Sequence, residues 1–302
     1  MATPAYKPDN DFPVPGEYGD VPPAIPGMPA ITFPLPGSED QILSALSGDS
    51  LTNVIMAGFI GDNGFVNPLN RGRFCACRDE QNKVEGVALI GHTILFEAFS
   101  DRTIETFAAL ARRQSSPHLL MGERKAVERF GSYYFAEHES PRLVCPILWL
   151  EQRQPFAKSG ELSELRSATR EDLELVVQAQ AAMAVEISGV DPLKQDPAGF
   201  CERYLRRIEQ KRVWVLIENG RLIFKADVIA QTPQISYIEG VYVTAEQRGK
   251  GVGSRCVREL GRILLDHSKA IYLFVENKNT RTKAFYLNLG FTVAGQYDLV
   301  YF

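Results

Sequence analysis

Along most of the chain, segments with apolar residues at three- and four-residue spacing alternate with short apolar runs. This pattern predicts helices that alternate with strands. An apolar stripe at three- and four-residue spacing predicts an amphipathic helix from Asp101 to Arg113, and a second helix follows from Gly122 to Gly131. Ser38, with Gln41 three positions later, predicts the start of an earlier helix. Short apolar runs predict strands at 73–77, 84–91, 118–121 and 143–150. This alternation is typical of an α/β domain.

A second α/β pattern follows the polar segment from Glu151 to Glu161, in which we place a domain boundary. Thr169, with Asp172 three positions later, predicts a helix start. Asn219-Gly220 between two apolar runs is the strongest short hairpin signal. The other elements expected here are strands at 162–168, 213–218, 222–230, 235–244 and 270–275, helices at 169–187, 198–210, 251–267 and 279–289, and two closing strands within 291–302.

Proline sets the first part of the chain apart, because residues 1–37 hold ten of its 18 prolines. Proline lacks an N–H group and fixes φ, so we expect an extended arm without a regular helix or central strand. The arm is either a flexible leader or a segment that docks on the folded body through its apolar side chains, and both readings stay open. The expected organisation is therefore the arm at 1–37, one domain at 38–155 and another at 160–302.

Composition excludes several classes of protein. Apolar residues make up 45% of the 302 residues, charged residues make up 23% and the formal net charge is −4. This balance is ordinary for a soluble globular protein and disfavours a nucleic-acid binder. No apolar run approaches the roughly 20 residues of a membrane span, and no secretory signal begins the chain. We therefore expect a cytoplasmic protein with no membrane and no nucleic-acid partner; the sequence does not indicate an oligomeric state.

The five cysteines and four histidines suggest no disulfide framework and no metal site. Cys75 and Cys77 form a C-x-C pair on one face of an expected strand, where we expect two buried, packed thiols. The histidines are dispersed without metal-ligand spacing, so no metal is expected.

The segment Arg248–Gly253 carries the clearest chemical signal. It follows an expected strand and opens an expected helix, and three of its residues are glycines at alternate positions. Glycine removes the Cβ atoms that would hinder the approach of a ligand to the backbone. The first helical turn leaves N–H groups without internal partners and favours anions. Together with the side chains of Arg248 and Lys250, the segment predicts a cradle for a pyrophosphate, with a spacing unlike that of a P-loop or a dinucleotide fingerprint.

This segment resembles the Q/R-x-x-G-x-G/A motif of the GNAT superfamily of acyl-CoA-dependent N-acetyltransferases, with Arg248, Gly251 and Gly253 at its defined positions. A second motif is also similar to the family's: Asn279 precedes the pair Phe285-Tyr286 and then Gly290-Phe291. The order of expected elements over 160–302 matches the GNAT fold. Thr282 departs from the family, which usually has Ala at this position.

The whole chain also resembles two-domain acetyltransferases with a degenerate GNAT-like domain in front. The segments that carry this resemblance are Glu186–Pro192, Phe224–Ala226 and Ile238–Val243. It implies an α/β fold with mixed sheets, made of tandem GNAT-like domains, with acetyl-CoA as cosubstrate bound by the second domain. The residues that it implies for acyl-CoA binding are Val241, Tyr242, Val243, Arg248, Gly249, Lys250, Gly251, Val252, Gly253 and Asn279.

Acetyl transfer to an amine needs a base, because an ammonium ion is not a nucleophile and amine pKa values lie at about 10. Glu239 is the candidate base. We expect it to share a strand face with Val241 and Val243, where partial desolvation would raise its pKa. A surface carboxylate, or one that acts only through water, is the open alternative.

Tyr286 is the candidate acid, because the resemblance places a Tyr at this helix position near the thioester sulfur. A buried core aromatic is the alternative reading. Asn279 is expected to cap its helix and, by resemblance, to lie near the pantetheine arm, which we expect to pair with the backbone of Val241 and Val243. The acidic loop with Glu186, Asp191 and Asp196 favours a cationic acceptor.

The leading hypothesis is an acetyl-CoA-dependent N-acetyltransferase that acts on a primary amine of a small molecule, an amino acid or a peptide by direct attack in a ternary complex. The alternatives are a non-catalytic acyl-CoA-binding regulator and a protein acetyltransferase whose first domain docks the target. The first domain is expected to bind no CoA, because its equivalent of the phosphate loop, Glu97–Asp101, contains two acids and no glycine.

Overall fold

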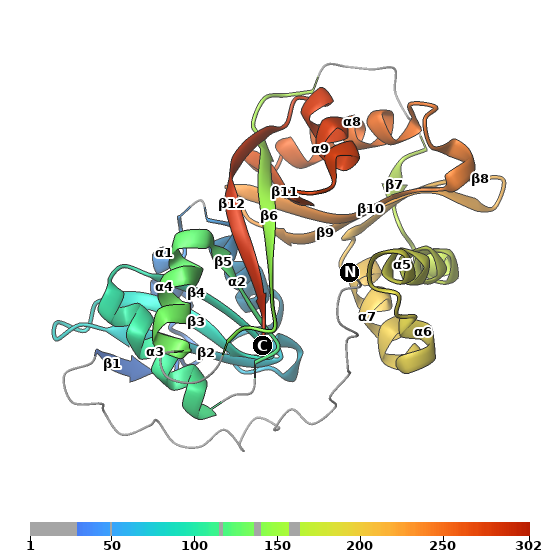
Figure 1. Cartoon of the computed structure of the whole chain (residues 1–302). Coiled ribbons are helices and arrows are strands. Elements are labelled where there is room, and N and C mark those ends of the chain that lie inside the picture. The colour runs from blue at the N-terminus through green and yellow to red at the C-terminus, as the bar shows by residue number, and fades with distance from the viewer. Residues whose placement is uncertain (1–28, 49, 115–116, 136–139, 157–163) are drawn as a thin grey trace. The chain divides into compact units, whose positions relative to one another are not determined.

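The computed structural model of the chain describes residues 29–48, 50–114, 117–135, 140–156 and 164–302. These residues form two compact units (Figure 1). The N-terminal unit contains the described residues up to 151 together with 274–286 and 292–302, and the C-terminal unit contains 152–273 and 287–291. The boundary between the units therefore crosses β11 (Ala270–Glu276) and α9 (Thr280–Asn288).

The N-terminal unit has a mixed sheet with the strand order β1-β2-β3-β4-β5-β12-β6. Only the β4–β5 pair is parallel among these described strands. The strands are β1 (Ala30–Thr32), β2 (Gly72–Arg78), β3 (Val84–Gly91), β4 (Thr93–Ala98), β5 (Leu119–Glu123), β6 (Leu143–Gln152) and β12 (Thr292–Tyr301). The helices are α1 (Glu39–Ala45), α2 (Leu51–Asn63), α3 (Asp101–Gln114) and α4 (Arg124–Tyr134), with a 3₁₀ turn at Pro68–Asn70.

The core of this unit lies between the sheet and the amphipathic helices α3 and α4. Phe107 on α3 and Phe130 on α4 are fully buried, and the Phe130 ring stacks on Phe96 of β4 with 5.2 Å between centroids. The expected helix at 101–113 is therefore confirmed, and its apolar stripe faces the sheet.

The last strand, β12, belongs to the N-terminal unit, although it is the end of the chain. It runs alongside β6 (Figure 1) and pairs antiparallel with both β5 and β6. Leu299 therefore lies between Met121 and Cys145. The prediction of two closing strands within 291–302 is wrong. Gly295 accommodates a register shift against β6, and the backbone continues as a single strand where the sequence suggested a turn.

The described part of the proline-rich arm, residues 29–37, docks on the N-terminal unit. β1 contains no proline and adds to the edge of the sheet by pairing with β2. The guanidinium of Arg73 lies 3.3 Å from the centroid of the Phe33 ring. Residues 1–28 lie outside the described residues.

The C-terminal unit is built on strands in the order β11-β10-β9-β8-β7, with only β10 and β11 parallel among these described strands. Helices α5 and α7 cover one face of this sheet and α8 covers the other (Figure 1). The strands besides β11 are β7 (Arg166–Ser167), β8 (Val213–Glu218), β9 (Arg221–Gln231) and β10 (Ile235–Val243). The helices are α5 (Leu173–Ser188), α6 (Pro192–Gln195), α7 (Pro197–Glu209) and α8 (Val252–Leu265).

Local sequence signals explain two of the turns in this unit. The carboxylate of Asp172 accepts hydrogen bonds from the N–H and the hydroxyl of Thr169, as expected for a helix start. Asn219 and Gly220 have φ values of 50° and 73°, which is the paired positive φ of a tight hairpin turn. The strand expected at 162–168 is shorter, and residues 157–163 of the expected boundary segment lie outside the described residues.

Candidate functional site

The predicted anion cradle is the loop between β10 and α8. A 3₁₀ turn (Ala245–Gln247) leads into exposed residues 248–251, and α8 begins at Val252. The first N–H of this helix that bonds back to the loop is that of Arg255, which donates to the carbonyl of Gly251. The three N–H groups before it belong to the first turn, which has no helical acceptors. The loop therefore presents backbone donors at the positive end of the α8 dipole.

Glycine is required in this loop by backbone conformation. Gly249 and Gly251 have φ values of 77° and 79°, in the left-handed region that costs other residues roughly 1–2 kcal/mol. A Cβ built on either residue would meet no atom within 4 Å. The space beside both residues is therefore open, which a ligand phosphate needs in order to approach the backbone.

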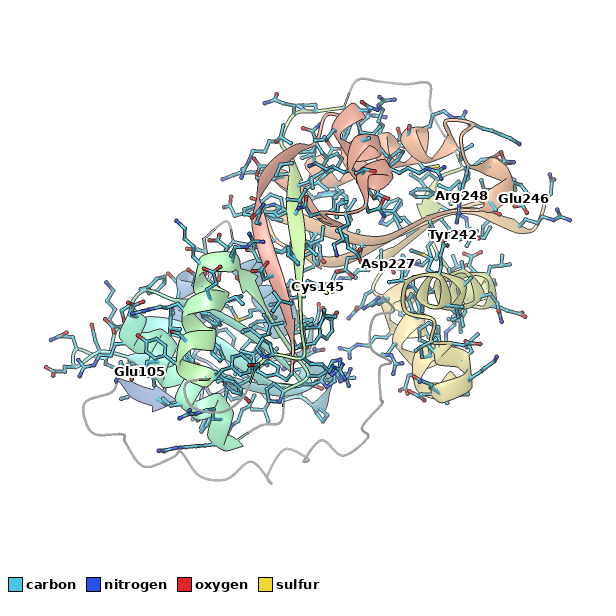
Figure 2. The ribbon with its side chains drawn as sticks, in the orientation of Figure 1. Glu105, Cys145, Asp227, Tyr242, Glu246 and Arg248 are labelled. Atoms are coloured by element: carbon cyan, nitrogen blue, oxygen red, sulfur yellow. The ribbon has the colours of Figure 1, made fainter. Side chains whose placement is uncertain are left out.

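Arg248 fixes the loop to its neighbours in the C-terminal unit. Figure 2 shows Arg248 near Tyr242 and Glu246. Nε of Arg248 donates to the carbonyl of Val243 at 3.0 Å, and its Nη2 lies 3.6 Å from the exposed carboxylate of Glu186 on α5. The exposed ion pair contributes little to stability. The carbonyl of Val243, which we expected to pair with a pantetheine arm, thus already accepts a hydrogen bond from Arg248. The side chain of Lys250 is exposed beside the loop.

A β-bulge interrupts β10 just before this loop. Glu239 pairs with Asp227 and Tyr242 pairs with Lys225, so two residues of β10 lie opposite one residue of β9. Gly240, with a φ of 58°, provides the left-handed residue that such a bulge needs. The bulge changes the alternation of faces: Glu239 shares its face with Tyr242, and the expectation that it faces the same way as Val241 and Val243 is wrong.

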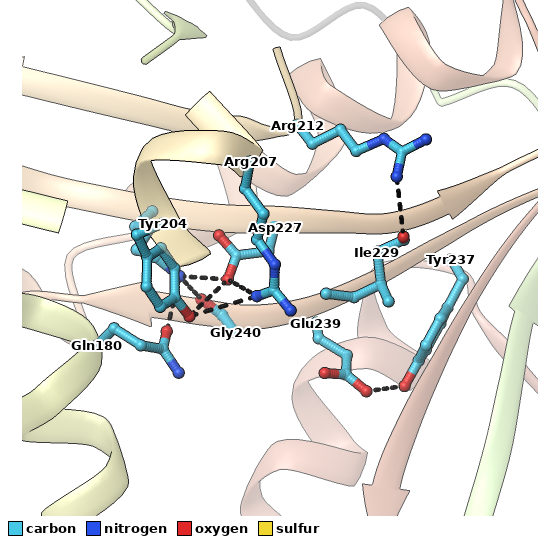
Figure 3. A network of polar contacts seen from close by, with 10 residues as sticks. Gln180, Tyr204, Arg207, Arg212, Asp227, Ile229, Tyr237, Glu239 and Gly240 are labelled. Atoms are coloured by element: carbon cyan, nitrogen blue, oxygen red, sulfur yellow. Dashed lines mark hydrogen bonds and ion pairs between the residues drawn. The ribbon is translucent and has the colours of Figure 1, made fainter. Parts of the chain in front are cut away.

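Glu239 lies on the sheet face that α7 covers. Tyr237 donates a hydrogen bond to its carboxylate, and the guanidinium of Arg207 lies between Glu239 and Asp227 (Figure 3). Surrounding protein raises the pKa of Glu239 by desolvation, while Tyr237 and Arg207 lower it. Its side chain nevertheless stays exposed to solvent. Protein therefore surrounds the carboxylate of Glu239 on most sides, and water reaches it from the remaining side.

A buried ion pair lies beside Glu239 on the same face of the sheet. Lys225 is fully buried and Asp227 is 2% exposed. Nζ of Lys225 donates to Oδ2 of Asp227 at 2.7 Å, to Oε1 of Gln180 at 2.8 Å and to the carbonyl of Gly240 at 3.4 Å (Figure 3). Burial lowers the pKa of Lys225, and the carboxylate of Asp227 opposes that shift. The lysine therefore ties α5, β9 and the bulge of β10 together.

Two residues of α7 complete this network. The hydroxyl of Tyr204 donates to Oδ2 of Asp227 at 3.3 Å, and burial raises the pKa of Tyr204 well above its usual range. Nη1 of Arg207 lies 3.7 Å from the same oxygen and 3.5 Å from the Tyr204 hydroxyl. Oδ1 of Asp227 is buried without a hydrogen-bond partner among the described residues. One carboxylate oxygen thus receives three groups while the other receives none.

The sequence reasoning did not assign Lys225, Asp227, Tyr204 or Arg207 to the site. A signal for the first two was present: they stand two positions apart within the stretch 222–230, which is otherwise apolar, and this spacing places both charges on one face of the strand. The contribution of α7 could not be found in this way, because it depends on how the helix packs on the sheet.

Asn279 and Tyr286 belong to the N-terminal unit, whereas Glu239 and the loop belong to the C-terminal unit. Oδ1 of Asn279 accepts from the N–H of Thr282 at 3.0 Å, which confirms the expected helix cap. Tyr286 is buried on α9 with its ring 5.0 Å from that of Phe285, and burial raises its pKa. Its phenol therefore stays protonated at neutral pH.

The acids between α5 and α7 are bonded within the protein. Asp191 accepts from the N–H of Leu193, and Asp196 accepts from the N–H of Gly199, so both cap helices. Asp196 also pairs with Arg203, and Glu186 pairs with Arg248. The three carboxylates whose negative charge suggested a cationic acceptor are therefore mainly engaged in helix caps and ion pairs within the protein.

The N-terminal unit has no comparable cradle at the expected position. β4 ends at Ala98 and α3 begins at Asp101, and Oγ of Ser100 accepts from the N–H of Thr103. Glu97 is held by the hydroxyl of Ser50 at 3.1 Å, and burial raises its pKa. A carboxylate and a side-chain cap thus occupy the place where the other unit has open space and glycines.

The cysteines are all free, and three of them, Cys75, Cys77 and Cys256, are buried. Burial raises the pKa of the Cys256 thiol to about 12, so it is not a thiolate at neutral pH. Among the residues that the structure describes, no cluster of His, Cys, Asp or Glu is arranged to hold a metal ion. No helix within these same residues is long and apolar enough to cross a membrane.

In a comparison with known families, residues 181–291 match the model of the Acetyltransferase (GNAT) family. This segment includes β10, the glycine loop and α8. A search of curated proteins finds no match to the chain.

Solved structures resemble the chain over most of its length. An acetyltransferase of the GNAT family from Colwellia psychrerythraea has 13% identity and a TM-score of 0.56, with 90% of this chain and 99% of that chain covered. A GCN5-related N-acetyltransferase from Sphaerobacter thermophilus has 14% identity and a TM-score of 0.58, with 92% and 96% covered. A tandem GNAT protein from the clavulanic acid biosynthesis pathway has 13% identity and a TM-score of 0.55, with 89% and 97% covered. These likenesses confirm the predicted α/β fold of tandem GNAT type.

Proposed function

Because residues 181–291 belong to the acetyltransferase (GNAT) family, we propose that this protein transfers an acetyl group from acetyl-CoA to a primary amine by direct attack in a ternary complex. The observation that supports this best is the loop before α8. It combines two glycines at positive φ, open space beside them and the unpaired N–H groups of a helix N-terminus. These features suit the diphosphate of CoA.

The residues that would hold acetyl-CoA are those of the loop and of the strand before it. Gly249, Gly251 and the first turn of α8, including Val252 and Gly253, offer backbone donors to the diphosphate. Arg248 and Lys250 add positive charge, and the backbone from Val241 to Val243, beside the bulge, would pair with the pantetheine arm. Bound there, acetyl-CoA supplies an activated acyl thioester.

Glu239 is the proposed base. It takes a proton from the acceptor's ammonium group, and the freed amine nitrogen attacks the carbonyl carbon of the thioester. The C–N bond forms, the C–S bond breaks and the thiolate of CoA receives a proton. Desolvation supports this role, since a base works best when its pKa lies near the working pH.

Tyr286 is the proposed acid, and it would give a proton or a hydrogen bond to the leaving thiolate. Its burial keeps the phenol neutral and therefore able to donate. Asn279 is proposed to act near the pantetheine in addition to capping α9. No covalent acyl-enzyme is needed, and the buried, protonated Cys256 is poorly suited to form one.

The acceptor classes that we propose are small amines, amino acids and peptides. We further propose that the N-terminal unit binds no CoA and has a structural role. The domain limits at 38–155 and 160–302 stay a prediction.

Release of free thiol from acetyl-CoA, measured with a panel of amines, tests the activity. The proposal expects thiol release that depends on the amine, with an N-acetylated product of matching mass. Binding of acetyl-CoA without turnover of any amine would favour a regulator, and turnover only of protein lysines would favour a protein acetyltransferase.

A further inference from the structure

Arg207 has more hydrogen-bonding capacity than the network around it uses. A guanidinium group has five N–H donors in a planar fork. Among the described residues, only its Nη1 has polar partners, the hydroxyl of Tyr204 at 3.5 Å and Oδ2 of Asp227 at 3.7 Å. Both contacts are long. Nε and Nη2 have no hydrogen-bond partner among the described residues. The side chain is 37% exposed although burial is the largest influence on its pKa, so solvent reaches part of it.

Asp227 does not require Arg207 to match its charge. Oδ2 of Asp227 already pairs with Nζ of Lys225 at 2.7 Å and accepts from Tyr204 at 3.3 Å. The close, buried pair is thus Lys225 with Asp227, and Arg207 contributes a second cation at the edge that faces solvent. The other carboxylate nearby is Glu239, toward which the Arg207 guanidinium extends (Figure 3).

An exposed carboxylate beside an accessible guanidinium matches a ligand that carries both charges. Glu239 suits an ammonium group, and the planar fork of Arg207 suits a carboxylate, which it can bind through two parallel hydrogen bonds. In an α-amino acid these two groups are attached to one carbon. A polyamine would instead need several carboxylates, and Glu186, Asp191 and Asp196 are engaged within the protein.

We propose that Arg207 binds the carboxylate of the acceptor, so that the protein acetylates the α-amino group of a free amino acid. This inference rests on the proposed acetyl transfer and names its acceptor class. Arg207 is then a specificity residue that touches the substrate. Lys225 and Asp227 hold the bulge and Glu239 in place beside it.

The experiment compares, for several side chains, an amino acid with its carboxamide and with the decarboxylated amine. The measured quantity is the ratio of kcat/KM for the amino acid over that for the decarboxylated amine. In the wild-type protein this ratio should be about tenfold to a hundredfold, the range expected for hydrogen bonds to a charged group. Arg207→Gln should bring the ratio close to one, and Arg207→Lys should restore part of it.

Arg203→Gln is the matched control, because Arg203 lies one turn earlier on α7 and forms a surface ion pair with Asp196. This variant should keep the wild-type ratio. Acetyl-CoA affinity and thermal unfolding of each variant show whether it is folded.

A wild-type ratio near one, or a ratio that Arg207→Gln leaves unchanged, would overturn the inference while acetyl transfer to amines stands. If no amine of any kind is acetylated, the proposed function itself fails, and this inference fails with it.

Discussion

Lys225→Met should destabilise the protein strongly, because it leaves the carboxylate of Asp227 buried without its closest cation. Removing one partner of a buried pair costs about 3–5 kcal/mol. Asp227 is 2% exposed, so water cannot replace the lost ammonium group. Tyr204 and Arg207 still face Oδ2, at 3.3 and 3.7 Å, and this residual support places the expected cost near the lower limit, about 3 kcal/mol.

The double variant Lys225→Met/Asp227→Leu separates the unpaired charge from the loss of packing. It replaces both charges by apolar groups, which for buried pairs is often neutral or stabilising. It should therefore be more stable than Lys225→Met alone. Urea unfolding is followed by the fluorescence of Trp214 on β8, with Trp149→Phe as common background, since these are the two tryptophans of the chain. A cost below about 1 kcal/mol for the single variant, or a double variant less stable than the single one, would refute the reasoning.

Four further outcomes follow from the structure. Since desolvation raises the pKa of Glu239, kcat/KM should rise with pH through a value above the ordinary glutamate pKa of about 4.3. Glu239→Gln should remove this rise, and an unchanged pH profile in that variant would exclude direct base catalysis by Glu239. A raised folded-state pKa costs stability once the group ionises, so Glu239→Gln should unfold at higher urea than wild type at pH 7. The difference should be lost as pH falls from the raised folded-state pKa to the unfolded pKa of about 4.3. Tyr286→Phe should lower kcat about 10²-fold and leave acetyl-CoA affinity intact; an unchanged kcat would leave Tyr286 only a packing role. Tyr297→Phe removes the acceptor of the buried Leu51 N–H and should cost about 1–3 kcal/mol in urea unfolding, whereas no measurable cost would contradict that bond.

Local chemistry made much of the fold predictable. The turn at Asn219-Gly220 and the helix start at Thr169 depend on residues within a few positions of each other, and both are confirmed. The glycine loop before α8 is similar: positive φ at Gly249 and Gly251 is a property of the loop itself. A single sequence is informative where the relevant contacts are short in range.

Features that depend on distant partners were missed or wrong. The bulge at Gly240 changes which side chains share a face with Glu239, and the alternation of the sequence alone does not show it. The closing strand was expected as two pieces, but pairing with β5 and β6 holds it in one. Likewise, the guanidinium of Arg207 lies near Glu239 only because α7 packs on that face of the sheet. In each case, tertiary packing decided between alternatives that were locally similar.

The position of β12 also bears on the prediction that residues 160–302 form a separate domain. Both hydrogen-bonded neighbours of this strand come from residues before 153. A fragment of residues 160–302 would leave both edges of β12 unpaired, which favours aggregation. We expect the expressed fragment to be insoluble or inactive, and a soluble, fully active fragment would contradict this.

Calorimetric titration with acetyl-CoA is the most direct test of the central claim, that the loop at 248–253 binds the cosubstrate. The wild-type chain should bind close to one molecule per chain. Gly251→Asp places a negative charge where the diphosphate is expected and should weaken binding about tenfold or more. Gly251→Asn has the same size and the same backbone strain without the charge, so it should bind more tightly than Gly251→Asp. Two molecules per chain, or equal affinity in wild type and Gly251→Asp, would contradict the account.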